Sequence, residues 1–392
     1  MKTSFPSERI GDVLKLERRV VDVDPMAIYE LIGVYSFGKG IFHREPTAGS
    51  DLGRYRFSWI KDGDLVLSNI QAWEGAIAVA EPNDDGCLGT HRFLTYVPAD
   101  ERVDTNYLRY FLLGELGMRL IRKASPGSVV RNRTLGIQAF ESLTIPLPPI
   151  GLQREIASYL DRLSSRTQQL KSHQSGAAQR VSALVTALVT RDDLSDRQKR
   201  EAGWRCVPLG EAMIPSDFRE PVDPDGVYRI AGVYSFGRGL IDRGSISGFD
   251  TSYHSLACLA RDDIVISRLG AWEGAIAVVD EKFAGAYVSP EFPTFTPRQD
   301  MLDPRYFAGI ARSSWLWDAI GGSTRGSMAR RKRVKAEHFL SIDAWLPPRD
   351  EQSRLAALLG RAFAAEGALK RSRSLVTALE PAALNAAFAA IA

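Results

Sequence analysis

Cysteine and histidine are scarce in this chain of 392 residues, which has three cysteines and five histidines. Cys87, Cys206 and Cys258 are too few and too scattered for a disulfide framework or a four-ligand zinc site, so we expect small, buried hydrophobic residues at these positions. The histidines lie far apart, and none recurs at the equivalent place in the internal repeat described below. We therefore predict neither a metal site nor a Ser-His-Asp arrangement.

Long apolar runs and a strong charge bias are also missing. The longest apolar stretches have about eight residues, and the N-terminal segment lacks the apolar core of a signal peptide, so we expect a soluble cytoplasmic protein without a membrane partner. The net charge is +3, which is too small to indicate nucleic-acid binding by itself. With 45% hydrophobic residues the chain is typical of folded proteins, and its length predicts two or three domains.

What the sequence does contain is an internal repeat. GVYSFGKG at 33–40 returns as GVYSFGRG at 232–239, and AWEGAIAV at 72–79 returns unchanged at 271–278. Both shifts are 199 residues, and the same shift pairs LPP at 147–149 with LPP at 346–348. Two long matches at one constant shift indicate a duplicated unit.

Each copy is rich in short apolar runs up to the LPP. The runs at 76–80 and 263–267 are bounded by turn residues and predict strands, and one short helix is expected at about 104–122. For AWEGAIAV we favour a core strand, with Trp73 and Trp272 as packing anchors.

A long amphipathic helix follows each LPP. Residues 153–188 contain no proline, and a narrow apolar seam recurs every three or four residues. At roughly 36 residues this helix is about 54 Å long. LVTAL closes the pattern at 184–188 and again at 375–379, where the shift falls to 191. We predict that the two helices form an antiparallel coiled coil with pseudo-two-fold symmetry, the alternative being a helix buried against its own domain. The seam residues are Leu160, Leu163, Thr167, Leu170, Gln174, Ala177, Val181, Leu184 and Leu188, then Leu355, Leu358, Ala362, Ala365, Leu369, Ser372, Val376 and Leu379.

The charged stretch at 190–201 contains few apolar residues, so we interpret it as the linker into the second copy.

Catalytic motifs are weak. Gly33 to Lys39 is close to a phosphate-binding P-loop, but Gly40 stands where a Ser or Thr must hold magnesium, and the second copy replaces the lysine with Arg238. The LPP segments are similar to the motif of amino-methyltransferases, yet leucine replaces the amide or acid that accepts the target amine. We predict no catalytic residues in this chain.

Cations follow a Gly/Ser-rich loop in both copies, which indicates a phosphate-contacting element used twice; a solvated charged turn is the alternative. In the first copy these are Arg131 and Arg133, and in the second Arg325, Arg330, Arg331, Lys332, Arg333 and Lys335.

The YSFG loop combines aromatic residues, glycines and one cation that is able to reach a phosphate or a guanine edge. Its candidates are Tyr35 with Lys39 and Tyr234 with Arg238, and the alternative is a tight turn with Tyr35 and Phe37 in the core. SNIQ at 68–71 aligns with SRLG at 267–270. Since Asn and Gln favour adenine and Arg favours guanine, Asn69, Gln71 and Arg268 are candidates for reading bases.

The order of these elements resembles the specificity subunit of type I restriction-modification enzymes over nearly the whole chain. The elements are the PLPP exit at 146–149, a long helix, a second domain that opens with GWRCVPLGE at 203–211, then LPPRDEQ at 346–352 and a second helix. The chain departs from the family pattern with GLQ at 151–153, where Glu-Gln is usual. It also departs in that its two domains are close relatives.

The resemblance implies an α+β fold with two homologous mixed α/β target-recognition domains. We assign domain 1 to 1–149, the first spacer helix and linker to 150–195, domain 2 to 196–348 and the second spacer helix to 349–392. The family implies a non-catalytic reader of double-stranded DNA that recognises a bipartite site and docks two methylation subunits, with restriction subunits as further partners. Cofactors are expected on the partners alone, S-adenosylmethionine for methylation and ATP for restriction.

Two other classes remain open on the residues alone. One is a stand-alone DNA-binding regulator, and the other is an ATP-using enzyme with a degenerate P-loop. Co-purification with a methyltransferase separates the first from a specificity subunit, and ATP turnover by the isolated chain supports the second.

Overall fold

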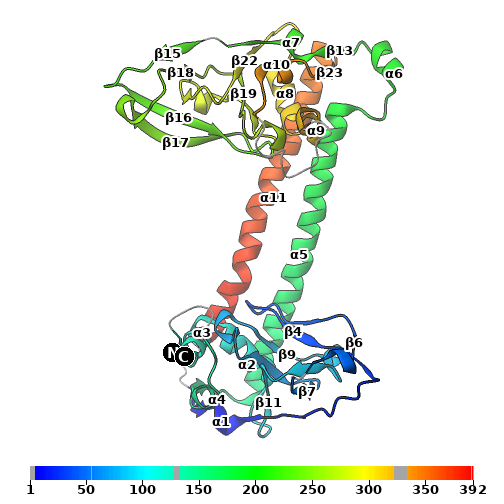
Figure 1. Cartoon of the computed structure of the whole chain (residues 1–392), viewed down its shortest axis with the longest axis vertical. Helices are drawn as coiled ribbons and strands as arrows, with labels where there is room; N and C mark the ends of the chain where they lie inside the picture. The colour runs from blue at the N-terminus through cyan, green and yellow to red at the C-terminus, as the bar shows by residue number, and fades with distance from the viewer. Residues whose placement is uncertain are drawn as a thin grey trace. The chain divides into compact units, whose positions relative to one another are not determined.

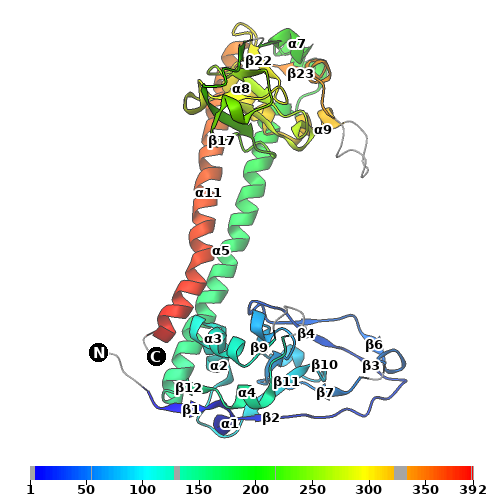
Figure 2. The same cartoon turned by 60° about the vertical axis from the view of Figure 1, so that its left-hand side comes forward.

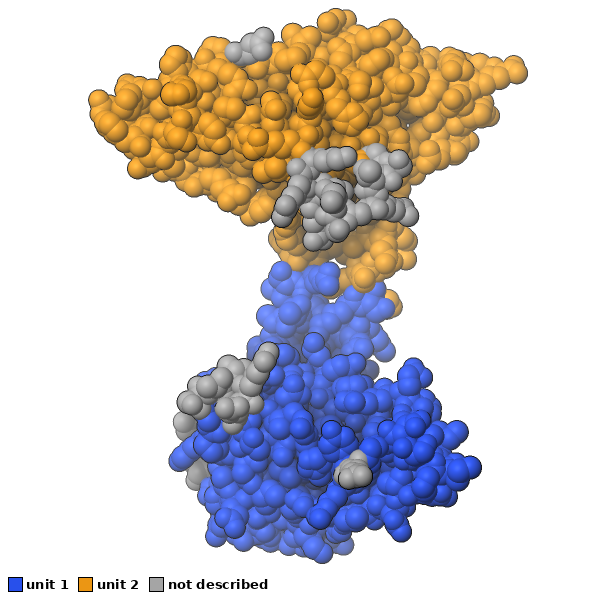
Figure 3. Space-filling view, viewed as in Figure 1, with its two compact units in different colours: residues 1–172, 373–392 blue, residues 173–372 orange. Residues whose placement is uncertain are grey.

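The computed structural model describes residues 5–53, 55–127, 133–216, 218–321, 333–389 and 391. The chain forms two compact units, coloured separately in Figure 3. Unit 1 comprises Met1–Ser172 and Arg373–Ala392, and unit 2 comprises His173–Ser372. Each unit therefore contains one of the repeated domains and a segment of each long helix.

The central sheet of unit 1 has four antiparallel strands in the order β2-β11-β8-β9. Unit 1 also contains the two-stranded pairs β1-β12, β7-β10, β3-β6 and β4-β5, most of whose strands are labelled in Figure 2. The strands are β1 (Ser7–Arg9), β2 (Leu14–Leu16), β3 (Ile28–Tyr29), β4 (Ile32–Val34), β5 (Ile41–His43), β6 (Thr47–Ala48), β7 (Phe57–Trp59), β8 (Leu65–Ser68), β9 (Ile77–Val79), β10 (Leu88–Thr90), β11 (Phe93–Pro98) and β12 (Thr144–Pro146).

Unit 2 repeats this arrangement, with the sheet β14-β22-β19-β20 and the pair β13-β23. A five-stranded sheet, β15-β18-β21-β16-β17, joins the segments that form separate pairs in unit 1. The strands are β13 (Arg205–Pro208), β14 (Met213–Pro215), β15 (Arg219–Pro221), β16 (Val227–Val233), β17 (Leu240–Ser247), β18 (Ser255–Cys258), β19 (Ile264–Ile266), β20 (Ile276–Val278), β21 (Tyr287–Val288), β22 (Thr294–Pro297) and β23 (Asp343–Leu346).

The four short helices of unit 1 recur in unit 2, which has α6 in addition. Two helices separated by Gly114 replace the single helix predicted at 104–122. Asp104 caps the first of them by accepting a hydrogen bond from the backbone N–H of Tyr107. The helices are α1 (Ile10–Val13), α2 (Thr105–Leu113), α3 (Glu115–Lys123) and α4 (Ile137–Glu141) in unit 1, then α6 (Asp196–Glu201), α7 (Leu209–Ala212), α8 (Pro304–Ala311), α9 (Ser314–Gly321) and α10 (Ala336–Leu340) in unit 2.

The long helices are α5 (Ile150–Thr190) and α11 (Arg349–Ala389), with 41 residues each. Their first and last residues both differ by 199 positions, although LVTAL shifts by only 191. Helix α11 therefore continues beyond LVTAL and includes Pro381. At about 1.5 Å per residue each helix is about 61 Å long, slightly longer than predicted.

Within each unit the two helices lie side by side and run antiparallel (Figures 1 and 2). In unit 1, Glu380 of α11 accepts a hydrogen bond from Thr167 and pairs with Lys171, whose Nζ lies 3.2 Å from Oε1. In unit 2, Gln174 Nε2 donates to Ser372 Oγ at 2.8 Å. These contacts confirm the predicted antiparallel pairing within each unit.

The seam differs from the prediction in register. Leu184 is 49% exposed whereas Val185 is 5% exposed, and Leu358 is 44% exposed whereas Leu359 is fully buried. The shift arises because these helix ends pack into the core of unit 2 as well as against each other. The end of α11 likewise enters the core of unit 1, where Phe388 packs against Tyr107 and Phe111.

Two further expectations are corrected. The charged linker is partly helical, because Ser195 and Gln198 form a capping box that starts α6. Of the three cysteines only Cys87 is buried, and Cys206 is exposed. The α+β class, the two related domains and the two long helices are confirmed. Within the described ranges, none of the helices combines the length and apolar composition that a bilayer crossing requires.

Candidate nucleic-acid interface

The two longest repeated motifs contact each other. In unit 1, the backbone N–H of Phe37 donates to the carbonyl of Glu74 at 2.9 Å, and that of Gly38 donates to Gly75 at 2.8 Å. In unit 2, Phe236 donates to Glu273 at 2.7 Å and Gly237 to Gly274 at 2.9 Å. The YSFG loop is therefore docked on the AWEG turn in the same way in both units.

The docked loop holds a phenylalanine in an uncommon conformation. The φ angles of Phe37 and Phe236 are 63° and 62°, in the left-handed region that favours glycine. Their side chains nevertheless point outward, being 75% and 58% exposed. The alternative with Tyr35 and Phe37 in the core is wrong, since Tyr35 is also exposed. A strained loop that presents aromatic rings to solvent is typical of a binding site.

The AWEG segment forms a turn and not the predicted strand. Ala72–Glu74 and Ala271–Glu273 are single 3-10 turns, and the strands β9 and β20 begin only after them. Each turn ends at a glycine with positive φ, 83° at Gly75 and 77° at Gly274. The backbone conformation favours glycine here, since a Cβ at Gly75 would lie 3.4 Å from the backbone nitrogen of Phe37, an ordinary contact, whereas the positive φ would strain any other residue.

Beside the loop of unit 1 lies a cleft of about 510 Å³. The predicted residues Tyr35, Lys39 and Gln71 line it together. Two arginines that the sequence analysis missed, Arg44 and Arg92, line the same cleft and are exposed. Arg44 has a detectable signal, since an arginine also stands 199 residues later, whereas Arg92 has none. Three cations around an open cleft favour a phosphate-bearing ligand.

Positions 69 and 268 occupy equivalent, firmly held backbone sites. The N–H of Asn69 donates to Arg92 at 2.8 Å and its carbonyl accepts from Leu135 at 2.7 Å. The N–H of Arg268 donates to Glu291 at 3.0 Å and its carbonyl accepts from Val334 at 2.8 Å. The framework is thus the same, while the side chains differ.

These positions carry polar atoms without partners among the described residues. Asn69 Oδ1, Arg268 Nε and Glu291 Oε2 are each buried and make no hydrogen bond there. A buried polar atom without a partner costs about 1–3 kcal/mol, so such atoms mark places where a ligand improves the bonding.

Residues 37–177 match the family model of the type I restriction modification DNA specificity domain. The resemblance inferred from the sequence is confirmed. The matched residues include the YSFG loop from Phe37 onward, the AWEG turn and Arg133. A search of curated proteins found no match.

Solved structures share the fold of nearly the whole chain. The HsdS subunit from Thermoanaerobacter tengcongensis has 20% identity and a TM-score of 0.59, with 98% of this chain and 97% of that chain covered. A chain from a study of complex assembly and conformational transition of the type I R-M system has 18% identity and a TM-score of 0.66, with 98% of both chains covered. The type I S subunit from M. genitalium has 13% identity and a TM-score of 0.52, with 98% and 96% covered.

Within the residues that match the family model, Arg133 lies beside the AWEG turn. Its guanidinium is 5.4 Å from the centre of the Trp73 ring, and its Nε donates to the carbonyl of Gly127 at 3.3 Å. In unit 2, Arg333 is exposed and its Nη2 lies 3.4 Å from Glu291 Oε1. Lys335 is exposed immediately before α10, whereas the remaining predicted phosphate contacts lie outside the described residues. These are Arg131, Arg325, Arg330, Arg331 and Lys332.

The cation of the second YSFG loop folds back over its aromatic neighbours. The Arg238 guanidinium lies 4.7 Å from the Tyr234 ring centre, and its Nε donates to the carbonyl of Ser235 at 2.9 Å. In unit 1 the segment that is close to a P-loop continues into strand β5, so no helix N-terminus is placed to hold a phosphate there.

Proposed function

We propose that this chain is the DNA-recognition subunit of a type I restriction-modification complex, in which each unit binds one half of a bipartite site. The observation that carries the proposal is the repetition of one assembly in both units. An exposed aromatic loop with a cation is fixed to the AWEG turn, beside position 69 or 268. The match of residues 37–177 to a DNA specificity domain supports the same function.

The proposal assigns different tasks to different residues. Lys39, Arg44, Arg92 and Arg133 contact phosphates, because they are cations grouped around the cleft and its neighbouring turn. Asn69, Gln71 and Arg268 read base edges, because these are the positions where the repeats offer different polar groups. Tyr35, Tyr234 and Arg238 belong to the docked YSFG loops and contact the DNA from there. The chain itself is non-catalytic in this proposal.

The long helices hold the two domains and dock the partner subunits. Both helices carry exposed leucines, for which a stand-alone regulator has no use. These leucines support the proposal that two methylation subunits dock on the helices, with restriction subunits beside them. S-adenosylmethionine and ATP belong to these partners. The exposed leucines are Leu170, Leu184, Leu358, Leu375 and Leu379.

The duplication predicts the form of the target. Two homologous domains that obey the predicted pseudo-two-fold symmetry meet the two DNA strands in equivalent ways, so the half-sites should be similar and inverted, with an unread gap between them. They should differ where residues 69 and 71 differ from 268 and 270.

The test is to co-express the full chain with the methylation subunit of its host and to map methylated adenines. We expect a stable complex and a bipartite motif with similar inverted half-sites. Failure to co-purify with the methylation subunit would overturn the proposed role as its specificity subunit. Two unrelated half-sites, or one continuous site, would overturn the proposal that the two related domains recognise similar half-sites. ATP turnover by the isolated chain would instead favour an enzyme.

A further inference from the structure

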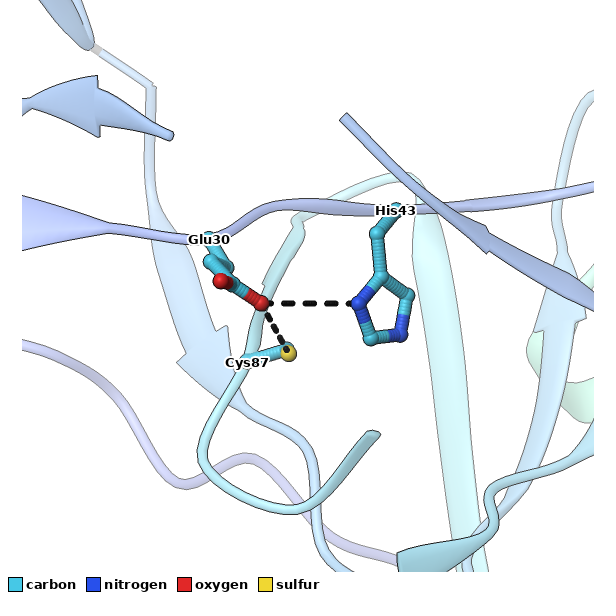
Figure 4. Close-up of side chains that lie close together, drawn as sticks. All are labelled: Glu30, His43 and Cys87. Carbon is cyan, nitrogen blue, oxygen red and sulfur yellow. Dashed lines mark hydrogen bonds and ion pairs between the residues drawn. The ribbon is translucent and has the colours of Figure 1, made fainter. Parts of the chain in front are cut away.

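Four polar side chains of unit 1 lie together outside the residues assigned to DNA. Three of them, from Glu30, His43 and Cys87, are shown in Figure 4, and the fourth is that of Asp84. Glu30 precedes β4, His43 ends β5, and Asp84 and Cys87 belong to the turn before β10. Glu30 Oε2 lies 3.4 Å from His43 Nδ1 and 3.9 Å from Cys87 Sγ. One ligand atom from each of Glu30, His43 and Cys87 lies within 4.8 Å of the others.

This spacing is close to that of a zinc site. With bonds of about 2.0 Å to nitrogen and oxygen and about 2.3 Å to sulfur, the ligand atoms of a tetrahedral zinc ion lie roughly 3.3–3.6 Å apart. The contacts of Glu30 at 3.4 and 3.9 Å need only small side-chain adjustments to reach those values. Thiolate, imidazole and carboxylate are all ligands that zinc accepts.

The fourth residue supports the histidine from behind. Asp84 Oδ1 lies 2.7 Å from His43 Nε2, so one ring nitrogen is held by a carboxylate while Nδ1 faces Glu30. Asp84 is itself buried and accepts a hydrogen bond from the backbone N–H of Glu81 at 2.8 Å. A carboxylate on the second ring nitrogen is the usual support of a metal-binding histidine, since it fixes the ring and its tautomer.

The second repeat replaces all four residues. Arg229, Asp242, Phe283 and Ala286 stand at the equivalent positions. The Arg229 guanidinium pairs with Asp242, with Nη2 2.8 Å from Oδ2, and lies 5.5 Å from the Phe283 ring centre. Unit 2 therefore fills this place with a cation of its own, while unit 1 presents two carboxylates, a thiol and an imidazole.

We propose that Glu30, His43 and Cys87 bind one zinc-class divalent ion, with solvent as the fourth ligand and Asp84 orienting His43. The ion joins the hairpin β4-β5 to the turn before β10. Because Leu31 and Arg44, which line the cleft, are the chain neighbours of Glu30 and His43, the ion stiffens one wall of that cleft. The competing arrangement is a protonated His43 that bridges Glu30 and Asp84 without a metal.

The test is a titration of the tag-free, chelator-treated full chain with Co²⁺ and Zn²⁺. We expect one equivalent of Co²⁺ to produce a thiolate-to-cobalt absorption band, which one equivalent of Zn²⁺ removes. Cys87→Ala and His43→Ala should abolish the band. Asp84→Asn should weaken Zn²⁺ binding about 10–100-fold, as expected for a residue behind a ligand.

Controls keep the test independent of folding and of DNA binding. The Cys87→Ala variant has the residue that the second repeat carries at the equivalent position, Ala286, so it should fold, and circular dichroism checks this. Cys206→Ala removes an exposed cysteine and should leave the band unchanged. The absence of stoichiometric binding, a band that survives Cys87→Ala, or a band that disappears in Cys206→Ala would overturn the metal site and leave the proposed DNA recognition untouched.

Discussion

The two units share one scaffold but carry different charges on it. Position 69 is asparagine and position 268 arginine, while their backbone partners, Arg92 and Glu291, differ in the sign of their charge. The main-chain bonds at these positions are nevertheless the same. Backbone geometry is therefore retained where the loop must be held, and side chains vary where a ligand is met.

A buried aspartate shows the same division inside the domains. In unit 1, Asp64 accepts two hydrogen bonds from Arg19, at 2.6 and 3.1 Å. Phe218 stands at the position of Arg19 in unit 2, and Asp263 instead accepts a hydrogen bond from Thr296 Oγ1 at 2.9 Å. Burial raises the pKa of Asp263. Both aspartates accept a backbone hydrogen bond, but Asp64 has an arginine as its further partner whereas Asp263 has a neutral hydroxyl.

The largest expected effect tests the scaffold that the units share. Gln153 and Gln352 are fully buried, and each makes three hydrogen bonds that join the start of a long helix to the domain before it. Gln153→Ala and Gln352→Ala leave these backbone groups unpaired, so each should cost its own unit about 3 kcal/mol. Native-state hydrogen exchange resolves the free energy of opening of each unit.

The exposed Gln169 provides the control for this pair, since Gln169→Ala should change neither unit. If only one of the two alanine substitutions lowered the free energy of opening of its unit, the shared scaffold would not be energetically equivalent in the two units.

The next effect sharpens the comparison of the buried aspartates. Arg19→Ala leaves Asp64 without its ion pair and should destabilise unit 1 by about 2 kcal/mol at pH 7, less than a fully buried pair because Arg19 is partly exposed. Thr296→Val in unit 2 should cost about 1 kcal/mol. The exposed Arg18, changed to alanine, is the control.

The pH dependence gives this prediction its sign. A raised pKa of a folded carboxyl group means that ionisation opposes folding, and that this penalty disappears as the pH falls through the folded pKa. Asp263 has such a raised pKa, and the hydrogen bond from Thr296 Oγ1 partly offsets the rise. Thr296→Val should therefore raise the pKa of Asp263 further. Its loss of stability, measured by hydrogen exchange, should shrink as the pH falls below 7, and a loss that does not change with pH would contradict the explanation.

The sequence predicted the parts of the fold that depend on short-range pattern. The constant shift of 199 located the duplication, and the spacing of apolar residues located both long helices. It missed contacts between distant segments, such as Phe388 in the core of unit 1 and Arg92 in the cleft, because neither follows a period. The AWEG segment was wrongly predicted as strand because its apolar residues are typical of a strand. They instead lie in a 3-10 turn that ends at a glycine.

Exchanging the variable position tests whether the differing charges determine the target. Asn69→Arg should move the preference of one half-site towards guanine, and Arg268→Asn should move the other towards adenine. Each change should alter discrimination by roughly 1–2 kcal/mol, or about tenfold, in binding to DNA with one half-site varied. Lys61→Ala, which removes a cation paired with Asp85, is the control for a general loss of charge. Equal weakening on every sequence would mean that these residues contact phosphates.

The smallest effect concerns the basic loops, where the units again differ. Arg133 lies beside the Trp73 ring, while Arg333 pairs with Glu291, so part of the charge of Arg333 is already balanced within the protein. Arg133→Gln should lower the slope of log K against log salt by about 0.9 and leave the preferred sequence unchanged, as for the loss of one phosphate contact. Arg333→Gln should lower it by less. Binding titrations of the partner complex between low and physiological salt measure both slopes. A changed sequence preference with an intact slope in Arg133→Gln would make this arginine a base reader and move it to the group of Asn69 and Arg268.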